Sequence, residues 1–407
     1  MKRLFVFGLA VMLVLGICYV PASAGGHFIK VMTRNQFLGA DLTPLILAQS
    51  PGDFTAAVEA ALAQIGANNF PLRARRLAAE IAFTRSDLIG LQEVYDFKLN
   101  GLNIGPPFVD HLEVTLDALK AKGLNYVVAA TVVNLDITIP FAMDDNGNNV
   151  QLSVVDRDVI LVREGVAFEK LGGDYTADGL CGVPIPNPIP IPSWPATLQS
   201  LPSADGCNYT IAGEIDSPTG PIAIERGFVG VDATVRGKKY RFVNTHLEQR
   251  LPDPTNPKSA ILQSLQAVEL VGTLQALTPP DLTLVLLGDF NSDAEDVSTG
   301  GIVPPYQIIV DAGYADIWDK NRLRFFIHPK GFTCCQPEDL ANSKSLLYER
   351  VDLIFVRGPS FNSLAFVTGQ VPIFPLALHP NWASDHGGVF GKLIFRRPHW
   401  RMKPKYR

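Results

Sequence analysis

The sequence predicts an α/β fold in which polar side chains gather at the ends of buried strands. Three apolar runs end in groups that carry chemistry: residues 88–91 lead to Glu93, residues 240–243 to His246, and residues 282–287 to Asp289. Segments with helical spacing separate these runs, which is the pattern of layered α/β proteins. In such folds ligands bind at the rim where strands end. We therefore expect one shared site, suited to metal-assisted hydrolysis.

The first 24 residues have the pattern of a secretory signal peptide. A basic start at Lys2 and Arg3 precedes an apolar stretch from about residue 4 to 20 and the small-residue segment Ala22-Ser23-Ala24. A membrane anchor would need roughly 20 apolar residues without a cleavage site. We expect cleavage after residue 24 and an exported chain, secreted or periplasmic. Removing two basic residues changes the net charge from −5 to −7.

The remaining elements follow from hydrophobic periodicity. Helices are expected at residues 54–66, 71–84, 110–122 and 257–276. Strands are expected at residues 28–33, 88–92, 126–133, 157–163, 227–235, 239–245, 282–288, 351–356 and 389–395. Four arginines on or just after the second helix are expected to form a solvated face: Arg73, Arg75, Arg76 and Arg85. Residues 144–149 are acidic at their start but lack the distal Glu of a calcium loop, so a plain turn is expected.

One domain with an insertion is expected over residues 25–395. Prolines alternate with apolar residues inside the stretch 172–221, which opposes helix and central strand and favours an extended surface segment. The last residues, 396–407, hold six Lys or Arg residues. We interpret them as a solvated basic tail, with a phosphate- or membrane-contacting tail as the alternative.

Four cysteines remain after the signal peptide, and structural disulfides are their expected use in an oxidising compartment. Cys181 and Cys207 flank the proline-rich stretch and would staple it. Cys334 and Cys335 would either bridge each other or each pair elsewhere, because connectivity does not follow from sequence. No Cys-x-x-Cys pair supports a zinc site.

The acidic and amide groups predict a metal and a positioned water. Glu93 leaves a buried strand and suits a hard cation such as Mg²⁺, which takes one or two carboxylates. Asn35, at the end of the first strand, would share that metal or bind a phosphate oxygen. Asp289 and Asn291 lie two residues apart in an extended segment and so face one side. Asp289 would orient or deprotonate a water, and Asn291 would hold that water or the oxyanion.

Two histidines have a context that predicts catalysis. His246 ends a strand, and His386 follows Asp385, whose carboxylate would raise the proton affinity of a neighbouring imidazole. A protonated histidine neutralises charge on a pentacovalent phosphate or protonates a leaving oxygen. Asp352 lies inside an apolar run, where an unpaired acid is costly, so it is the expected partner of His386.

Taken in order, these segments resemble the endonuclease/exonuclease/phosphatase superfamily, which includes deoxyribonucleases, abasic-site endonucleases, bacterial sphingomyelinases and inositol-phosphate phosphatases. Each segment is short, but the ordered set is specific and spans nearly the whole chain after the signal peptide. The matching segments are Arg34-Asn35, Leu91-Gln92-Glu93-Val94, Asn244-Thr245-His246-Leu247, Gly288-Asp289-Phe290-Asn291, Arg350-Val351-Asp352 and Ser384-Asp385-His386.

The resemblance implies a four-layer α/β/β/α sandwich of two mixed sheets with helices outside. It implies Mg²⁺, or else Mn²⁺ or Ca²⁺, on Glu93 with help from Asn35 and Asp385. It also implies water attack on a phosphoester and gives each catalytic and substrate-binding group its place. Asp289 and Asn291 would position the water. The phosphate would be contacted by His246 and by His386, which Asp352 supports. By a looser match, Arg157 would also contact the phosphate.

The substrate stays open between two phosphodiesters, with a small-molecule phosphomonoester behind them. A nuclease would need a basic face, and the mature chain is net negative; net charge does not decide about local patches, however, and the basic tail keeps a nucleic acid substrate open. A phospholipid or sphingomyelin phosphodiesterase would need peripheral membrane contact, for which the Pro- and Ile-rich residues 184–192 and Trp194 are candidates. A non-catalytic binding protein is the alternative from another class. A serine hydrolase is disfavoured because no Gly-x-Ser-x-Gly elbow appears.

Overall fold

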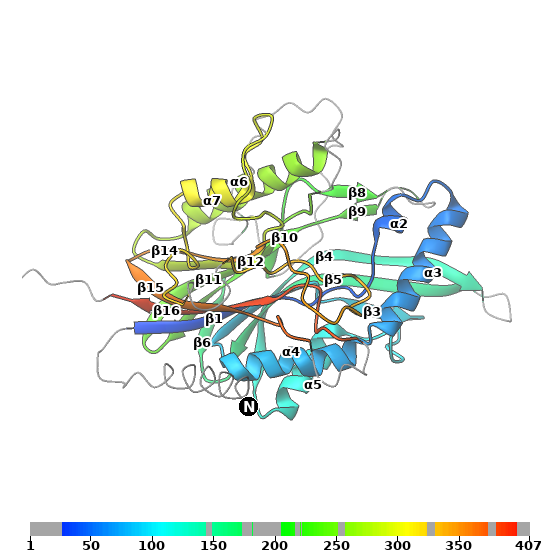
Figure 1. The fold of residues 1–407 in the computed structure, drawn as a ribbon, viewed down its shortest axis with the longest axis horizontal. Helices are drawn as coiled ribbons and strands as arrows, with labels where there is room; N and C mark the ends of the chain where they lie inside the picture. Colours follow the sequence, from blue (N-terminus) through cyan, green and yellow to red (C-terminus); the bar gives the residue numbers. More distant parts are fainter. Residues whose placement is uncertain are drawn as a thin grey trace, which may run out of the picture.

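The computed structural model describes residues 27–143, 149–172, 181, 205–215, 220, 222–250, 257–323, 330–372 and 380–396. Two mixed sheets of seven strands form its centre (Figure 1). The first sheet has the order β15-β16-β1-β2-β5-β3, with β4 paired to β5. Its strands are β1 (His27–Asn35), β2 (Leu88–Gln92), β3 (Asp96–Leu99), β4 (Tyr126–Met143), β5 (Asn149–Arg163), β15 (Phe361–Thr368) and β16 (Gly388–Phe395).

The second sheet has the order β13-β14-β12-β11-β10-β6, with β7 paired to β10. Its strands are β6 (Ala167–Lys170), β7 (Gly206–Asn208), β10 (Gly227–Val235), β11 (Lys238–His246), β12 (Thr283–Asp289), β13 (Ala315–Asp316) and β14 (Asp352–Arg357). A separate small hairpin joins β8 (Gly213–Ile215) to β9 (Ile222–Ile224).

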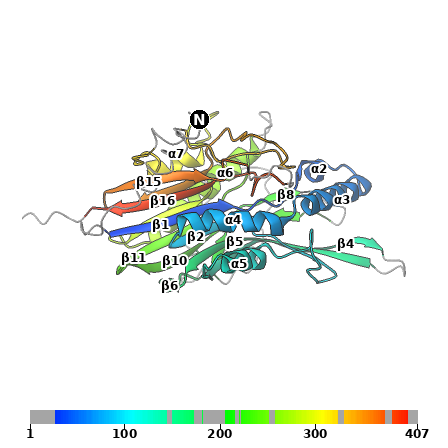
Figure 2. The same ribbon diagram turned by 60° about the horizontal axis from the view of Figure 1, so that its bottom comes forward.

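The helices lie outside the two sheets. They are α2 (Thr43–Ile46), α3 (Pro51–Ala67), α4 (Phe70–Thr84), α5 (His111–Ala121), α6 (Lys258–Leu277) and α7 (Pro305–Asp311). α4 and α5 cover the outer face of the first sheet, and α6 and α7 cover the second (Figures 1 and 2). Between the sheets, Val31 and Val162 of the first pack with Phe242 and Leu287 of the second, all without exposed surface. The four-layer sandwich expected from the sequence is confirmed.

Each sheet contains one parallel pair, and both pairs have a helical crossover. β1 pairs with β2 in parallel, and the chain between them carries α2, α3 and α4. β11 pairs with β12 in parallel, and α6 connects them. Parallel neighbours need such long connections, whereas antiparallel β10 and β11 need only a two-residue turn at Arg236 and Gly237, both with positive φ. The predicted polar groups lie at or just after the carboxyl ends of β1, β2, β11 and β12, and they are Asn35, Glu93, His246 and Asp289.

Several expectations need correction. β4 and β5 are longer than residues 126–133 and 157–163, and their hairpin extends beyond the sandwich (Figure 2). Residues 206–208, inside the predicted surface insertion, form β7, and Cys207 is buried, so a surface segment is wrong for them. The solvated arginine face is also wrong in part: Arg73 and Arg76 are buried, while Arg75 and Arg85 are exposed.

Other expectations fall outside the described residues. They include the signal peptide, most of the proline-rich stretch, the turn at residues 144–148 and nearly all of the basic tail. In the part of the chain that is described, no helix combines the length and apolarity needed to cross a bilayer. The structure joins Cys181 to Cys207, as expected, and resolves the open alternative by joining Cys334 to Cys335.

Candidate active site

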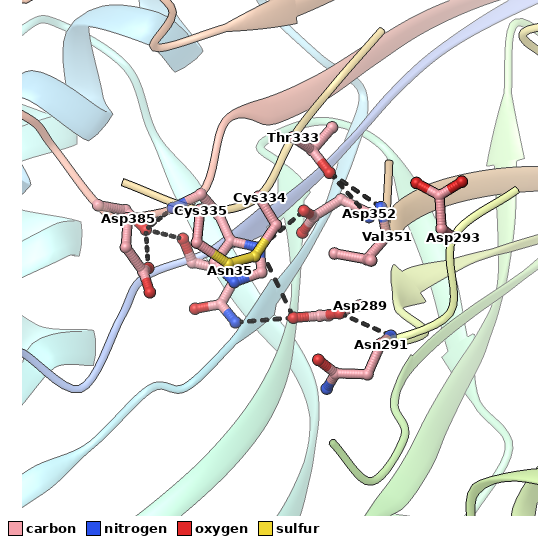
Figure 3. Close-up of a disulfide and its surroundings, with 12 residues drawn as sticks. Asn35, Asp289, Asn291, Asp293, Thr333, Cys334, Cys335, Val351, Asp352 and Asp385 are labelled. Atoms are coloured by element: carbon pink, nitrogen blue, oxygen red, sulfur yellow. Dashed lines mark hydrogen bonds and ion pairs between the residues drawn. A yellow bond between two sulfur atoms is a disulfide. The ribbon is translucent and has the colours of Figure 1, made fainter. Parts of the chain in front are cut away.

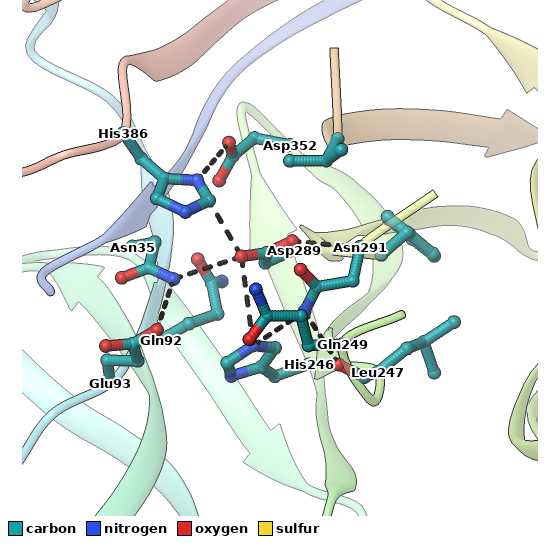
Figure 4. A network of polar contacts seen from close by, with 12 residues as sticks. Asn35, Gln92, Glu93, His246, Leu247, Gln249, Asp289, Asn291, Asp352 and His386 are labelled. Atoms are coloured by element: carbon teal, nitrogen blue, oxygen red, sulfur yellow. Dashed lines mark hydrogen bonds and ion pairs between the residues drawn. The ribbon is translucent and has the colours of Figure 1, made fainter. Parts of the chain in front are cut away.

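Strand register brings three of the predicted residues together on the second sheet. β11 and β12 pair so that His246 lies beside Asp289, and β12 and β14 pair so that Asp289 lies beside Asp352. The three side chains therefore come from paired positions on three adjacent strands, at the same end of these strands. All three residues are buried. Figure 4 shows them facing a common centre.

The first sheet supplies the facing half of the site. Asn35 ends β1 and Glu93 follows β2, while Ser384, Asp385 and His386 precede β16, which pairs with β1. Asn35 links the halves, because its Nδ2 donates to Glu93 Oε1 at 2.9 Å and to Asp289 Oδ2 at 3.0 Å. The site therefore exists only where the two sheets pack face to face.

His386 and Asp352 form the closest charged pair of the site. His386 Nδ1 lies 2.7 Å from Asp352 Oδ2. Burial alone would lower the pKa of His386, but the carboxylates of Asp352, Asp385 and Asp289 outweigh it and raise that pKa well above its usual value. The imidazolium is thus stabilised and oriented by a partner on the other sheet, as the sequence predicted.

His246 has the opposite electrostatic setting. Burial, then the positive charges of Arg226 and His386, lower its pKa well below the usual value. Its Nδ1 lies 3.2 Å from Arg226 Nη1, and its Nε2 lies 3.2 Å from Asn291 Nδ2. A guanidinium and an amide NH2 group both only donate, so each ring nitrogen of His246 faces a donor, and a neutral imidazole accepts from only one of them at a time. The pKa values of the two imidazoles are therefore shifted in opposite directions, upward for His386 and downward for His246.

Asp289 occupies the centre between these imidazoles. Its Oδ2 lies 3.7 Å from His246 Nε2 and 3.7 Å from His386 Nδ1. Its Oδ1 accepts the backbone N–H of Asn291 at 2.9 Å, and Oδ2 accepts from Asn35. Burial raises its pKa, Asp352 adds to that rise, and His386 opposes it. A carboxylate that is fixed in orientation and raised in basicity is suited to take a proton from water.

The predicted metal ligands have the donor chemistry of a hard-cation site. Glu93 is held by Asn35 and by the backbone N–H of Leu38, which donates to Oε2 at 2.7 Å. The pKa of Asp385 is raised to about 7 by burial and by repulsion from Glu93, against the charges of His386 and Arg73. A divalent cation relieves that repulsion, and oxygen donors suit Mg²⁺. Donor atoms of Asp289, Asp352 and His386 also lie within 4.8 Å of one another.

Two site residues adopt a left-handed backbone. Glu93 has φ +55° and Asn291 has φ +47°. Glu93 directly follows β2, whereas Asn291 lies two residues after the end of β12, so the segment from Asp289 to Asn291 is not extended as the sequence led us to expect. A left-handed conformation costs a non-glycine residue on the order of 1 kcal/mol, and strain of this kind gathers at functional sites.

Arg157 is not brought into this cluster. Its guanidinium bonds to Asp110, at 2.6 Å, and to Val94 O at 3.0 Å. Side chains alternate along β5, so the neighbouring Asp158 faces the other way, 4.0 Å from His246 Nδ1. Burial and then the charge of Asp156 raise the pKa of Asp158 well above its usual value. A role for Arg157 in substrate binding stays a prediction.

Sequence reasoning missed Arg226, which directly contacts His246. The residue precedes Gly227, and register pairs Gly227 with His246 across the β10–β11 hairpin. Its Nη2 lies 3.6 Å from Glu248 Oε1. Burial lowers the pKa of Arg226, but Glu248 and Asp156 more than offset this and raise it. The sequence contained a signal for this contact. A two-residue turn at 236–237 pairs Gly227 with His246, which brings the preceding residue, Arg226, next to the imidazole.

Arg73 was also missed, because it was expected on a solvated face. Its buried guanidinium donates to four backbone carbonyls. The acceptors are Gln36 O at 2.6 Å, Phe37 O at 3.0 Å, Asn68 O at 3.1 Å and Ala383 O at 3.2 Å. Gln36 and Phe37 follow Asn35, and Ala383 precedes Ser384-Asp385-His386. Arg73 therefore ties together the segments next to Asn35 and Asp385, which are two of the three predicted metal ligands.

Fold and site together define a hydrolase of phosphoester bonds. A family model described as the Endonuclease/Exonuclease/phosphatase family matches residues 63–386, which is most of the chain. The chain belongs to this family, as the resemblance indicated. No curated protein sequence matches it.

Several solved structures are similar to this chain. Truncated Caenorhabditis elegans TDP2 is 14% identical, with 91% of this chain and 98% of that one covered and a TM-score of 0.44. An endonuclease/exonuclease/phosphatase from Beutenbergia cavernae is 19% identical, with coverages of 90% and 72% and a TM-score of 0.47. Bacteroides thetaiotaomicron mannosyl-6-phosphatase is 17% identical, with coverages of 90% and 100% and a TM-score of 0.46. The family assignment rests on the sequence model.

Proposed function

We propose that the protein is an exported, Mg²⁺-dependent phosphodiesterase that acts on nucleic acid or on a phospholipid such as sphingomyelin. The observation that carries the proposal is the placement of two imidazoles on either side of one carboxylate. His246 and His386 each have a ring nitrogen 3.7 Å from Asp289 Oδ2. They come from different sheets and their pKa values are shifted in opposite directions, so one phosphate group between them would meet two imidazoles of different basicity.

Asp289 is the group that prepares the attacking water. Asn35 and the backbone N–H of Asn291 hold both of its oxygens, so the carboxylate keeps one orientation. Its raised pKa makes it a stronger base than a solvated aspartate. Asn291 Nδ2 donates to Leu247 O at 2.9 Å, which holds the amide beside His246.

His386 is the group that meets negative charge on the phosphorus centre. Asp352 keeps the imidazolium protonated and oriented, and the cation stabilises oxygens that gain charge as water attacks. His246, whose lowered pKa favours the neutral imidazole, contacts a phosphate oxygen. A divalent cation on Glu93, Asn35 and Asp385 would polarise the phosphoryl oxygen and neutralise charge. Mn²⁺ or Ca²⁺ would suit the same oxygen donors.

Export and substrate rest on sequence features that lie outside the described residues. The basic start, apolar stretch and Ala-x-Ala segment support a signal peptide. The basic tail supports contact with phosphates, and the Pro- and Ile-rich stretch supports peripheral contact with a membrane. A small-molecule phosphomonoester is the second candidate substrate class. A non-catalytic binding protein is disfavoured because such a chain would be expected to lose a site residue, whereas His246, Asp289, Asn291, Asp352 and His386 are all present.

A hydrolysis panel on the mature chain tests the proposal. Plasmid DNA, RNA, sphingomyelin vesicles and a soluble phosphodiester are each offered with Mg²⁺ and with chelator. His386→Ala is compared with a matched control, His27→Ala, since His27 is exposed at the start of β1. We expect chelator-sensitive cleavage of one substrate class, reduced at least about a hundredfold in His386→Ala and unchanged in His27→Ala.

Other outcomes would redirect the proposal. Cleavage that survives chelation would refute the metal requirement. Cleavage of a phosphomonoester alone would replace the phosphodiester. No cleavage of any substrate, together with no Mg²⁺ binding by calorimetry, would favour the non-catalytic alternative.

A further inference from the structure

The Cys334–Cys335 disulfide lies on a segment that is fastened to both halves of the candidate active site. Thr333 Oγ1 accepts the backbone N–H groups of Val351 and Asp352, both at 3.1 Å. On the other side, Gly387 N donates to Thr333 O at 2.6 Å, and Gln336 N donates to Asp385 O at 2.7 Å. The two cysteines are therefore held between the segments that carry Asp352 and His386. Figure 3 shows the disulfide between Asp385 and Asp352.

The sulfur atoms are close enough to His386 to share a ligand with it. Both Sγ atoms and a ring nitrogen of His386 lie within 4.8 Å of one another. Ligand atoms around a tetrahedral zinc ion are about 3.8 Å apart when the Zn–S distance is about 2.3 Å. Breaking the S–S bond lets the sulfurs separate, so small side-chain movements suffice. Cys334 is buried and Cys335 is partly exposed, which gives a reductant and an ion access from one side.

We propose that reduction of the Cys334–Cys335 disulfide creates, together with His386, a binding site for a soft divalent cation such as Zn²⁺, and that its occupation stops hydrolysis. In the first step a dithiol reductant gives up two electrons and two protons. The S–S bond breaks, two thiols form, and the reductant closes its own disulfide. In the second step the cation binds and displaces three protons into solvent, one from each thiol and one from the His386 imidazolium.

This site differs in chemistry from the predicted Mg²⁺ site. Two thiolates and an imidazole select soft or borderline ions, whereas Glu93, Asn35 and Asp385 offer the oxygen donors of a hard ion. The two sites share no predicted ligand. Occupation of the thiolate site would still stop hydrolysis, because His386 would bind the cation and no longer contact the phosphate. The inhibitory half of the proposal rests on the proposed function, and the binding half does not.

Cd²⁺ is the probe for the binding half, because thiolate-bound Cd²⁺ has a charge-transfer band in the ultraviolet. The full mature chain is reduced with a dithiol, desalted without oxygen, checked by thiol counting, and titrated with Cd²⁺ in excess Mg²⁺. The Cys181→Ala/Cys207→Ala variant removes the other disulfide, so reduction acts on the vicinal pair alone. Cys334→Ser/Cys335→Ser is its matched counterpart. If the first variant folds poorly, reduced wild type replaces it against the same counterpart.

We expect the band in the reduced Cys181→Ala/Cys207→Ala chain, no band before reduction, and none in Cys334→Ser/Cys335→Ser. His386→Asn should weaken Cd²⁺ binding at least about tenfold, since one of three ligands is lost. An equal band in Cys334→Ser/Cys335→Ser, no band after reduction, or a pair that stays oxidised would each overturn the site. Unchanged affinity in His386→Asn would remove His386 from it.

Activity on the substrate found in the panel tests the inhibitory half. Zn²⁺ should lower hydrolysis more than tenfold in the reduced chain and not in the oxidised chain. A thiolate band without inhibition would overturn only this half. Because the band needs no substrate, a chain that hydrolyses nothing would still confirm or reject the cation site.

Discussion

Replacing Arg73 by Met tests whether one buried cation holds the first-sheet half of the site together. The guanidinium has no exposed surface and donates to the carbonyls of Gln36, Phe37, Asn68 and Ala383. Methionine fills much of the same volume but donates nothing. Four buried carbonyls would lose this donor. The segment after Asn35 and the segment before His386 would no longer be joined through one side chain.

The magnitude follows from those four bonds. Leaving a buried acceptor without its donor costs about 1–3 kcal/mol. The lower end applies here, because burial lowers the pKa of Arg73 to about 9 and so the charged form is itself costly in the native state. Four acceptors at about 1 kcal/mol each give a loss of about 4 kcal/mol in the free energy of unfolding. That is a large part of the 5–15 kcal/mol typical of a folded protein.

Urea unfolding and a Mg²⁺ titration of activity measure the two consequences. We expect Arg73→Met to lose about 4 kcal/mol and to need at least about tenfold more Mg²⁺, because Asn35 and Asp385 are less well placed. Arg73→Lys should fall between, since one ammonium has three donors and a smaller span. Arg75→Met is the control, on the same helix but exposed. A loss below about 1 kcal/mol with unchanged Mg²⁺ demand would refute the reasoning.

Three further predictions concern other parts of the chain. Glu269 accepts a hydrogen bond from Thr210, and burial raises the pKa of its carboxyl group. Glu269→Gln should therefore become more stable than wild type as the pH rises above about 4.5, and not below it, which urea unfolding at several pH values measures. A difference in stability that does not depend on pH would contradict this. Arg226→Met should lower kcat about tenfold without a matching rise in KM, because the donor to His246 is lost; a change in KM alone would point to substrate binding. Gly90→Ala should lower the free energy of unfolding by about 1–3 kcal/mol, as thermal or urea unfolding would measure. The reason is that the new Cβ would lie 2.4 Å from a side-chain carbon of the second sheet. An unchanged melting curve would count against tight packing at this position.

The sequence predicted the fold and the strand ends where the proposed catalytic residues gather, because both depend on local patterns. Long apolar runs such as residues 282–287 identified buried strands, and the polar residue after each run identified a strand end. Helices with strong periodicity were found to within a few residues, as α4 (Phe70–Thr84) shows against the expected 71–84. The order of the motifs then supplied the family, and the family supplied the sandwich.

Failures arose where partners far apart in sequence decide the environment. Arg73 and Arg76 lie on a helix whose charged residues looked solvated, but carbonyls of distant loops surround them. Arg157 was expected to bind the phosphate, but strand alternation turns the neighbouring Asp158, and not Arg157, toward His246. The segment 206–208 followed prolines and was expected on the surface, yet its pairing with β10 buries it.

The contact between Gln92 and Asn244 shows why the site could be predicted as a list but not as a geometry. Gln92 Nε2 donates to Asn244 Oδ1 at 2.5 Å, and Asn244 Nδ2 donates to Leu91 O at 2.9 Å. These bonds join the first sheet to the second directly behind Glu93 and His246, and they lie across Gly90, where a methyl group does not fit. The distance between the two halves of the site is therefore set by sheet-to-sheet packing. It follows that a substitution such as Gly90→Ala, which touches no catalytic group, should lower activity more than its cost in stability explains.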